Sequence, residues 1–289
     1  MFKVYLNGRI EPVAEAMVPA GDTGLLLGAG LFETLRAYER FVFRLDDHLD
    51  RLLASAEALE IPVAESRDEI ARALEAVIRE NALADARCRI TITRGPLPSE
   101  HLAGPPRPTC LVTAGEMTPY DDELYAGGMT VTVSEARVNR NDPTCRHKTT
   151  AYLPNLLALR DAHAKGAQEA LRFNGPGRLA EGCISNVFVV RGGRLVTPPV
   201  EEGCLPGIAR KVVLELAEAA GIEAAEEPVE GADVLKADEM FLTNTIMEAM
   251  PVCRIERHPL PGGDRPGEIT RRLMDLYKRQ VEKERAAAE

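Results

Sequence analysis

The sequence lacks several features that mark particular classes of protein. It contains no tryptophan, and aromatic residues make up only 4% of its 289 residues. No apolar run approaches the roughly 20 residues that a membrane-spanning helix requires, so we expect no membrane association. The first eight residues are too short and too polar a stretch to be a signal peptide, so no export is implied and we expect a cytoplasmic protein.

Signs of a metal site or of nucleic-acid binding are also missing. The formal net charge is −10, whereas a general nucleic-acid binder would carry a broad basic face. Six cysteines occur without any Cys-x-x-Cys pair, which disfavours the usual zinc spacings and is typical of a reduced compartment. We therefore expect no metal and no nucleic-acid partner, and we interpret the cysteines as small buried residues with free thiols. They are Cys88, Cys110, Cys145, Cys183, Cys204 and Cys253.

The N-terminal part is predicted to be α+β. Asn7-Gly8 is typical of a tight turn between two strands within residues 4–10. Asp46 and Asp47 are expected to cap a helix with apolar residues at helical spacing up to Leu59. The spacing of Ser66 and Glu69 predicts a capping box that opens a second helix. Further strands are expected at residues 32–38, 41–44, 88–93 and 109–114.

The chain is long enough for two domains, and its composition is that of a globular protein. We expect a small α/β domain over residues 1–115, a linker over residues 116–128 and a larger domain over residues 129–289. In the larger domain, a hairpin is predicted around Gly192-Gly193. Helices are predicted over residues 152–166, over residues 207–220 and after Gly267, and strands over residues 129–133 and 240–243.

Three residues or short segments could together bind a flat, phosphorylated ligand. Lys148 has an amine that could form a Schiff base, although a lysine taken alone is more often a solvated surface residue. Glu181, expected on a short strand, could pair with a pyridinium nitrogen and keep it protonated. The N–H groups of Gly207 to Ala209, at the start of a helix, could bind a phosphate, although an ordinary loop-to-helix junction has the same pattern.

Other polar residues are weaker candidates for the same site. Arg51 on the first helix and the Thr243-Asn244-Thr245 turn could add phosphate donors. Arg137 and Arg140 lie in a basic segment just before Lys148 and could bind substrate carboxylates. For each of these residues, simple exposure to solvent remains an alternative.

Several blocks of sequence together resemble the class IV, or fold-type IV, enzymes that depend on pyridoxal phosphate. These blocks follow one another in the order and spacing of that family, and they span nearly the whole chain. They are Asp22 to Thr34, His48-Leu49-Asp50-Arg51-Leu52, the Lys148 segment, the Glu181 strand and Leu205-Pro206-Gly207-Ile208.

The resemblance implies an α+β fold with a small N-terminal domain, a larger C-terminal domain and pyridoxal 5'-phosphate in the cleft between them. Lys148 would be the catalytic Schiff-base lysine, and Glu181 would be the partner of the ring nitrogen. A homodimer acting on a small amino substrate is also implied. The phosphate would be bound by Arg51, Gly207, Ile208, Ala209, Asn244 and Thr245, and Tyr152 would contact the phenolic oxygen. The family commonly has threonine where this chain has Ala209, so one hydroxyl is lost and Asn244 could compensate.

The resemblance leaves the reaction open. The expected substrate contacts are Phe32, Arg94, His101, Arg137 and Arg140. The loop after Arg94 keeps His101 but has Ser99 where D-amino-acid aminotransferases have arginine, which disfavours that activity. The Thr243-Asn244-Thr245 turn and the Arg137–Arg140 segment resemble the lyases, whose substrate is a dicarboxylate. Our first hypothesis is therefore a 4-amino-4-deoxychorismate lyase that forms 4-aminobenzoate and pyruvate.

Three alternatives remain. The second hypothesis is amino transfer from branched-chain or other amino acids to 2-oxoglutarate. The third is a binding protein that keeps the fold without turnover, which the presence of both Lys148 and Glu181 disfavours. A Cys/His hydrolase is a fourth and weaker possibility, because no Cys or His lies in a recognisable nucleophile setting.

Overall fold

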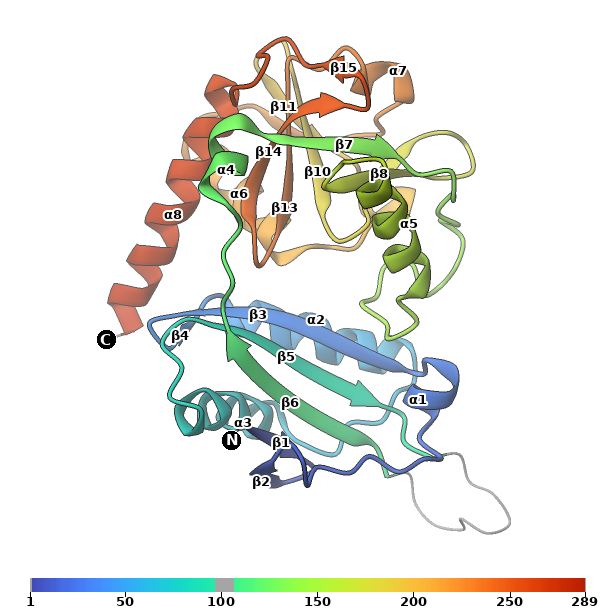
Figure 1. Ribbon diagram of the computed structural model, residues 1–289, viewed down its shortest axis with the longest axis vertical. Helices are drawn as coiled ribbons and strands as arrows, with labels where there is room; N and C mark the ends of the chain where they lie inside the picture. Colours follow the sequence, from blue (N-terminus) through green and yellow to red (C-terminus); the bar gives the residue numbers. More distant parts are fainter. Residues whose placement is uncertain (1, 97–106, 289) are drawn as a thin grey trace. The chain divides into compact units, whose positions relative to one another are not determined.

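The computed structural model describes residues 2–96 and 107–288 (Figure 1). These residues form two compact units. The first comprises the described residues among 1–118, 147–152 and 285–289, and the second comprises residues 119–146 and 153–284. The predicted boundary at residues 116–128 does not describe the return of residues 147–152 to the first unit, and the domain limits stay a proposal.

The first unit is built on an antiparallel sheet (Figure 1). Among the described residues its strand order is β2-β1-β6-β5-β3-β4. The strands are β1 (Lys3–Leu6), β2 (Arg9–Pro12), β3 (Gly30–Tyr38), β4 (Phe41–Val42), β5 (Ala86–Thr93) and β6 (Thr109–Glu116). The helices are α1 (Thr23–Leu27), α2 (Leu45–Ala58) and α3 (Arg67–Glu80).

Local sequence signals explain two of the element boundaries in this unit. The β1–β2 hairpin turns at Asn7 and Gly8, both with positive φ, as the Asn-Gly pair predicted. The Ser66–Glu69 capping box is present at the start of α3. The predicted start of α2 was wrong, because the helix begins one residue before Asp46. Its N-cap is Arg44, whose backbone is in the left-handed region. Asp46 and Asp47 lie in the first turn, where their negative charges interact favourably with the helix dipole but do not cap the helix.

One hydrophobic core joins α2 and α3 to the sheet. Alternate residues of β3 belong to it, among them Leu31, Leu35 and Ala37, together with Leu49 of α2 and Leu74 of α3. Successive side chains of a strand point to opposite faces. Phe32 and Glu33 of β3 therefore face opposite sides of the sheet, so the two side chains have different neighbours in the candidate site.

The second unit contains a larger, mixed sheet (Figure 1). Among the described residues its order is β12-β11-β10-β13-β14-β7-β8-β9, and β15 pairs with β14. The β11–β12, β14–β7 and β7–β8 pairs are parallel. The strands are β7 (Met129–Val133), β8 (Glu169–Phe173), β9 (Leu179–Gly182), β10 (Asn186–Arg191), β11 (Arg194–Thr197), β12 (Ala224–Glu226), β13 (Glu239–Asn244), β14 (Glu248–Ile255) and β15 (His258–Pro259).

The helices of the second unit come before, between and after these strands in the chain. They are α4 (Asp122–Gly127), α5 (Leu153–Ala164), η1 (Val200–Glu202), α6 (Ile208–Ala219), α7 (Gly231–Val234) and α8 (Glu268–Ala288), the last of which continues into residues of the first unit. The predicted hairpin turn is confirmed, since Gly192 and Gly193 both have positive φ between β10 and β11. In the described part of the chain, no helix combines the length and apolar character needed to cross a membrane.

Candidate active site

The Lys148 segment extends the sheet of the first unit. The Phe32 N–H donates to the Lys148 carbonyl at 2.8 Å, and the Thr150 N–H donates to the Gly30 carbonyl at 2.9 Å. Leu31 and Thr149 form an antiparallel bridge. These bonds fix the backbone of Lys148 beside the first half of β3.

Two aromatic rings lie beside the Lys148 amine. Its Nζ lies 4.7 Å from the ring centroid of Phe32 and 5.8 Å from that of Tyr152. The two rings pack edge to face at 5.3 Å. The guanidinium of Arg89 on β5 stacks on the same Phe32 ring at 3.8 Å. An amine, an apolar surface and a second cation are therefore gathered on one face of this sheet.

Arg51 belongs to a buried network on the helix side of β3. Its Nε and Nη2 donate to the two carboxylate oxygens of Glu33 at 2.8 and 2.6 Å. His48 Nδ1 lies 2.8 Å from Glu33 Oε2. The bidentate pair fixes the plane of the Arg51 guanidinium, which is the geometry in which arginine recognises phosphate or carboxylate.

The Glu181 carboxylate is bonded to groups of the second unit. Its Oε2 accepts the Leu205 N–H at 2.9 Å, and Arg172 Nη1 lies 3.6 Å from its Oε1. Arg172 on β8 is the direct cross-strand neighbour of Glu181 on β9. Arg172 is thus a positively charged neighbour of the carboxylate that could pair with a protonated ring nitrogen.

The turn after Glu181 is held by a second buried acid. Glu169 is 1% exposed, and its carboxylate accepts the N–H groups of Ala170, Cys183 and Ile184 and the hydroxyl of Ser185, at 2.9 to 3.2 Å. Burial raises the pKa of Glu169, and the four donors oppose that effect. The turn that follows Glu181 is thereby fixed.

The predicted phosphate cradle lies at the start of α6. Gly207 is its N-cap, and no side chain within the described residues caps the helix. Asn186 Nδ2 donates to the Leu205 carbonyl at 2.8 Å, and a Cβ added to Gly207 would lie 1.9 Å from Asn186 Oδ1. Ile208 and Ala209 are buried in the first turn. The N–H groups at this helix start are suited to an anion.

The Thr243-Asn244-Thr245 segment lies where β13 ends. Asn244 Oδ1 accepts the N–H groups of Ile246 and Met247, both at 2.9 Å. Its Nδ2 donates to the Ile184 carbonyl at 3.1 Å. The Asn244 side chain therefore joins its own turn to the turn after Glu181, and Thr245 is half-buried beside it. The role of Asn244 as a phosphate donor stays a prediction.

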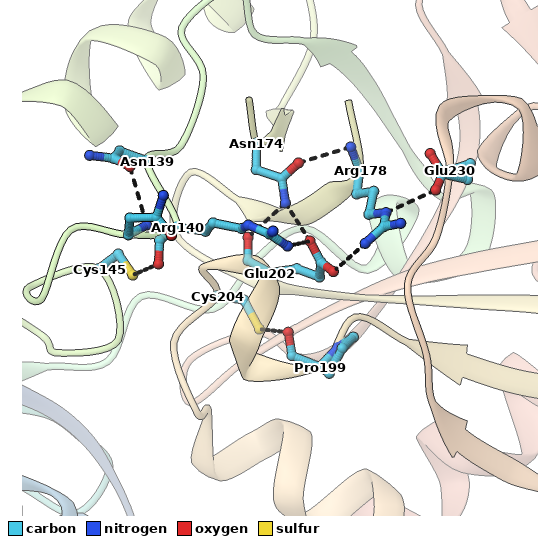
Figure 2. Close-up of polar contacts among 10 residues, drawn as sticks. Asn139, Arg140, Cys145, Asn174, Arg178, Pro199, Glu202, Cys204 and Glu230 are labelled. Atoms are coloured by element: carbon cyan, nitrogen blue, oxygen red, sulfur yellow. Dashed lines mark hydrogen bonds and ion pairs between the residues drawn. The ribbon is translucent and has the colours of Figure 1, made fainter. Parts of the chain in front are cut away.

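The candidate substrate residues lie in different places. Arg140 pairs with Glu202 at 3.2 Å (Figure 2), and the Arg137 guanidinium lies 5.7 Å from the Phe173 ring centroid. Arg94 is exposed and donates to the Glu60 carbonyl at 3.2 Å. Phe32 lies against Lys148, and His101 is outside the described residues.

The predicted site residues thus fall into two sets. Phe32, Arg51, Lys148 and Tyr152 belong to the first unit, as does Arg94, which directly follows β5. The second unit holds the remaining described ones, which are Arg137, Arg140, Glu181, Gly207, Ile208, Ala209, Asn244 and Thr245.

Five residues of this arrangement were missed from the sequence. Arg89 could have been found, because it alternates with the apolar Cys88 and Ile90 of its strand and must face the other side. Glu33, Glu169, Arg172 and Glu202 each depend on a partner distant in sequence, and spacing carries no signal for them.

Comparison with known proteins decides the family. The family model for amino-transferase class IV matches residues 30–255. The chain belongs to the class IV aminotransferases. As one of them it is a pyridoxal phosphate-dependent enzyme, and the α+β fold expected from the sequence is confirmed.

Similar class IV aminotransferases have different reactions. The chain is 38% identical over 280 residues to the "putative branched-chain-amino-acid aminotransferase" of Methanocaldococcus jannaschii, covering 96% of this chain and 95% of that protein. It is 32% identical over 281 residues to the aminodeoxychorismate lyase of Bacillus subtilis, covering 96% and 94%.

Solved structures of class IV aminotransferases share the fold. The branched-chain amino acid aminotransferase of Escherichia coli matches with a TM-score of 0.89 and 30% identity, covering 95% of this chain and 92% of that one. The enzyme of the same type from Thermobaculum terrenum in its PLP form matches with a TM-score of 0.86 and 31% identity, covering 96% and 93%.

The side chains in each unit fit this cofactor. The first unit offers the Lys148 amine beside two ring faces. The second offers the Glu181 carboxylate and a helix start at which a side chain on Gly207 would collide with Asn186. An aldehyde, a ring nitrogen and a phosphate need these three kinds of group.

Proposed function

We propose that this class IV aminotransferase transfers amino groups between branched-chain amino acids and 2-oxoglutarate. The observation that carries the proposal is the apolar surface beside Lys148, formed by Phe32 and Tyr152. Such a surface suits an aliphatic side chain, because its burial is favourable by about 25 cal/mol per Å². The similarity to the Methanocaldococcus jannaschii protein supports the same reaction.

Residues of each unit are given a role toward pyridoxal phosphate in this proposal. When bound, that cofactor supplies an aldehyde to which amines attach and a ring that accepts electrons. Lys148 Nζ holds the cofactor between turnovers and moves a proton to or from the substrate carbon. Glu181 holds the proton on the ring nitrogen. The N–H groups of Ile208 and Ala209, together with Arg51 and Thr245, bind the phosphate.

Arg89 is the proposed partner of a substrate carboxylate. Its guanidinium stacks on Phe32, and its Nε donates to Thr91 Oγ1 at 3.0 Å. Those contacts fix its plane on the face that also carries the Lys148 amine. A fixed guanidinium plane favours bidentate binding of a carboxylate.

Lyase activity on 4-amino-4-deoxychorismate is the second candidate. The Bacillus subtilis relative supports it, as does the basic segment before Lys148. We place it second because Arg140 is paired with Glu202 and the Asn244 amide bonds to backbone groups. The lyase hypothesis rests on the Arg137–Arg140 segment and the Asn244 turn, and both Arg140 and Asn244 have structural partners.

We also infer that the enzyme works as a homodimer. Leu25, Leu26 and Leu27 of α1 are exposed by 70, 62 and 68%. Three consecutive exposed leucines are typical of a surface that another protein chain covers. A second copy of this chain is the proposed occupant.

Parallel assays test the reaction. Purified enzyme with pyridoxal phosphate is given L-leucine, L-isoleucine or L-valine with 2-oxoglutarate, and glutamate is measured. The same enzyme is given 4-amino-4-deoxychorismate, and pyruvate is measured. We expect rapid glutamate formation and slow or no pyruvate release; the reverse result would establish the lyase instead.

A lysine variant tests the shared chemistry. Lys148→Ala should lose both activities and also the visible absorbance band of the lysine-bound cofactor, because its side chain has no amine. Glu230→Gln, an exposed acid bonded to Arg178, is the matched control and should keep the band. A Lys148→Ala protein that retains the band would exclude Lys148 as the attachment point.

A further inference from the structure

A single buried carboxylate connects three segments of the second unit (Figure 2). Glu202, at the end of η1, is 3% exposed. It accepts hydrogen bonds from Asn174 Nδ2 at 2.6 Å, Arg178 Nη1 at 3.1 Å and Arg140 Nη1 at 3.2 Å. Figure 2 shows the Glu202 side chain between the two arginines.

Glu202 is ionised at neutral pH. Burial acts to raise its pKa, but Asn174, Arg178 and Arg140 outweigh burial and hold the pKa below its ordinary value. A buried charge is tolerated only when it is paired and hydrogen-bonded in this way. Removal of the charge would leave two guanidinium groups facing each other.

The three segments lead into the Lys148 segment, the Glu181 strand and the start of α6, all of which are assigned to the cofactor in the proposed function. Arg140 lies in the connector, residues 137–146, which runs into the Lys148 segment. Arg178 lies three residues before Glu181. Glu202 lies three residues before Leu205, whose N–H binds Glu181, and five before the Gly207 cradle.

The backbones of these segments are also in close contact. Gly203 has φ +98°, and a Cβ there would lie 2.8 Å from Val138 Cγ1 and 3.2 Å from the Arg140 Cα. The Val138 N–H donates to the Phe173 carbonyl at 2.9 Å. Asn174 Nδ2 also donates to the Glu202 carbonyl at 3.1 Å. The connector therefore lies directly against the segment that leads to the cradle.

We propose that Glu202 is a positioning residue that holds the connector and the approach to the phosphate cradle in their binding arrangement. Arg140 then serves this ion pair instead of binding substrate. The inference rests on the proposed function, because the role of the cradle is part of that proposal. Glu202 does not touch the reacting atoms and acts only through Arg140, Asn174 and Arg178.

Limited proteolysis and cofactor binding test the inference together. Glu202→Gln keeps the shape of the side chain and removes its charge. Trypsin cleavage after Arg137, Arg140 and Arg146 is followed by mass spectrometry on the cofactor-free protein. The dissociation constants of pyridoxal phosphate and of pyridoxal, which lacks the phosphate, are measured by titration.

We expect connector cleavage about tenfold faster and pyridoxal phosphate affinity about tenfold lower in Glu202→Gln, because bonds to a charged group are lost. Pyridoxal affinity should change much less, since it does not use the cradle. Glu230→Gln is the control. It removes the outer, exposed partner of Arg178 and should match the wild type within twofold in every measurement.

Several outcomes would overturn the inference. Unchanged protection and affinity in Glu202→Gln would do so, and so would faster cleavage spread evenly over the whole chain, which would indicate general destabilisation. If Glu202→Gln does not fold, Arg140→Gln replaces it. This variant should expose the connector to cleavage after Arg137 and Arg146, and protection equal to the wild type would contradict the role.

The proposed function fails separately. A wild-type protein that binds no pyridoxal phosphate would end that proposal. The protection of the connector would still report on Glu202 in that case.

Discussion

At the scale of single residues, Glu33 shows how one buried acid sets the local charge. Burial acts to raise its pKa, but Arg51 and His48 more than offset burial and lower the pKa to about 2. Burial lowers the pKa of His48, and the positive charges of Arg51 and Lys148 lower it further, while Glu33 opposes the shift. Neutral His48 and cationic Arg51 are thus both bonded to an ionised carboxylate.

This ionised carboxylate should make the protein sensitive to acid. Because the pKa of Glu33 is about 2 in the folded state and 4.5 ordinarily, its stabilising effect is complete above about pH 4.5 and is lost as the pH falls towards 2. The loss is roughly 3 kcal/mol by linkage. Urea denaturation of the cofactor-free protein between pH 3 and pH 7 should show a shallower pH dependence in Glu33→Gln.

Glu80→Gln is the control for that measurement. Glu80 forms an exposed ion pair with Lys3 at 2.8 Å, and such pairs contribute little to stability. Its pH profile should follow that of the wild type. Equal slopes for Glu33→Gln and the wild type would show that Glu33 is not the group responsible.

At the scale of elements, the junction of η1 and α6 depends on one glycine. Gly207→Ala should move Asn186 away from the Leu205 carbonyl, because the new Cβ would lie 1.9 Å from Asn186 Oδ1. Loss of that hydrogen bond, and the shift of the helix start, should weaken pyridoxal phosphate binding about tenfold. Fluorescence titration of the cofactor-free protein measures the change.

Gly175→Ala is the matched variant. A Cβ there would meet nothing within 4 Å, so the affinity should equal that of the wild type. If Gly207→Ala binds the cofactor as tightly as Gly175→Ala does, the start of α6 is not the phosphate site.

The elements also show what the sequence could predict. The turns at Asn7-Gly8 and Gly192-Gly193 were predictable, because glycine and asparagine accept positive φ without help from the rest of the fold. The start of α2 was not, because its N-cap Arg44 adopts a left-handed conformation that no residue-type preference indicates.

The site residues likewise fall into those that a sequence motif predicts and those that only the fold brings together. Lys148 and Glu181 each lie in a short sequence motif of their own, so they were predictable from the sequence. Arg172 beside Glu181 follows from the register of β8 and β9, and Glu202 beside Arg140 joins residues 62 positions apart. Such pairs, whether across neighbouring strands or far apart in the sequence, depend on the packed fold and have no local pattern.

At the scale of the whole molecule, α1 is fixed well enough to serve as an interface. Its N-cap, Asp22, is fully buried and accepts hydrogen bonds from Gly24, Thr93 and Thr109 at 2.6 to 2.7 Å. The three exposed leucines that follow are therefore held in a defined place, and a partner surface can match them without ordering the segment first.

Leu26→Lys tests the dimer. A charge placed at the centre of this apolar surface should convert the dimer to a monomer, because a buried lysine would be left unpaired. Light scattering after size-exclusion chromatography measures the mass. Leu235→Lys, at a single leucine that is 60% exposed, should leave the mass unchanged, and a monomeric wild type would remove the basis of the proposal.

The interleaved path of the chain has a consequence for its synthesis. The described residues among 147–152 and 285–289 belong to the first unit, so residues 2–118 gain their full set of partners only after these later segments have been made. The segment beside β3 arrives only after some thirty further residues have been added to residue 118, and the end of α8 arrives after the whole of the second unit. Since domains usually fold in order as they emerge, an unfinished product of this gene should be a poor folder and a natural substrate for chaperones or proteases.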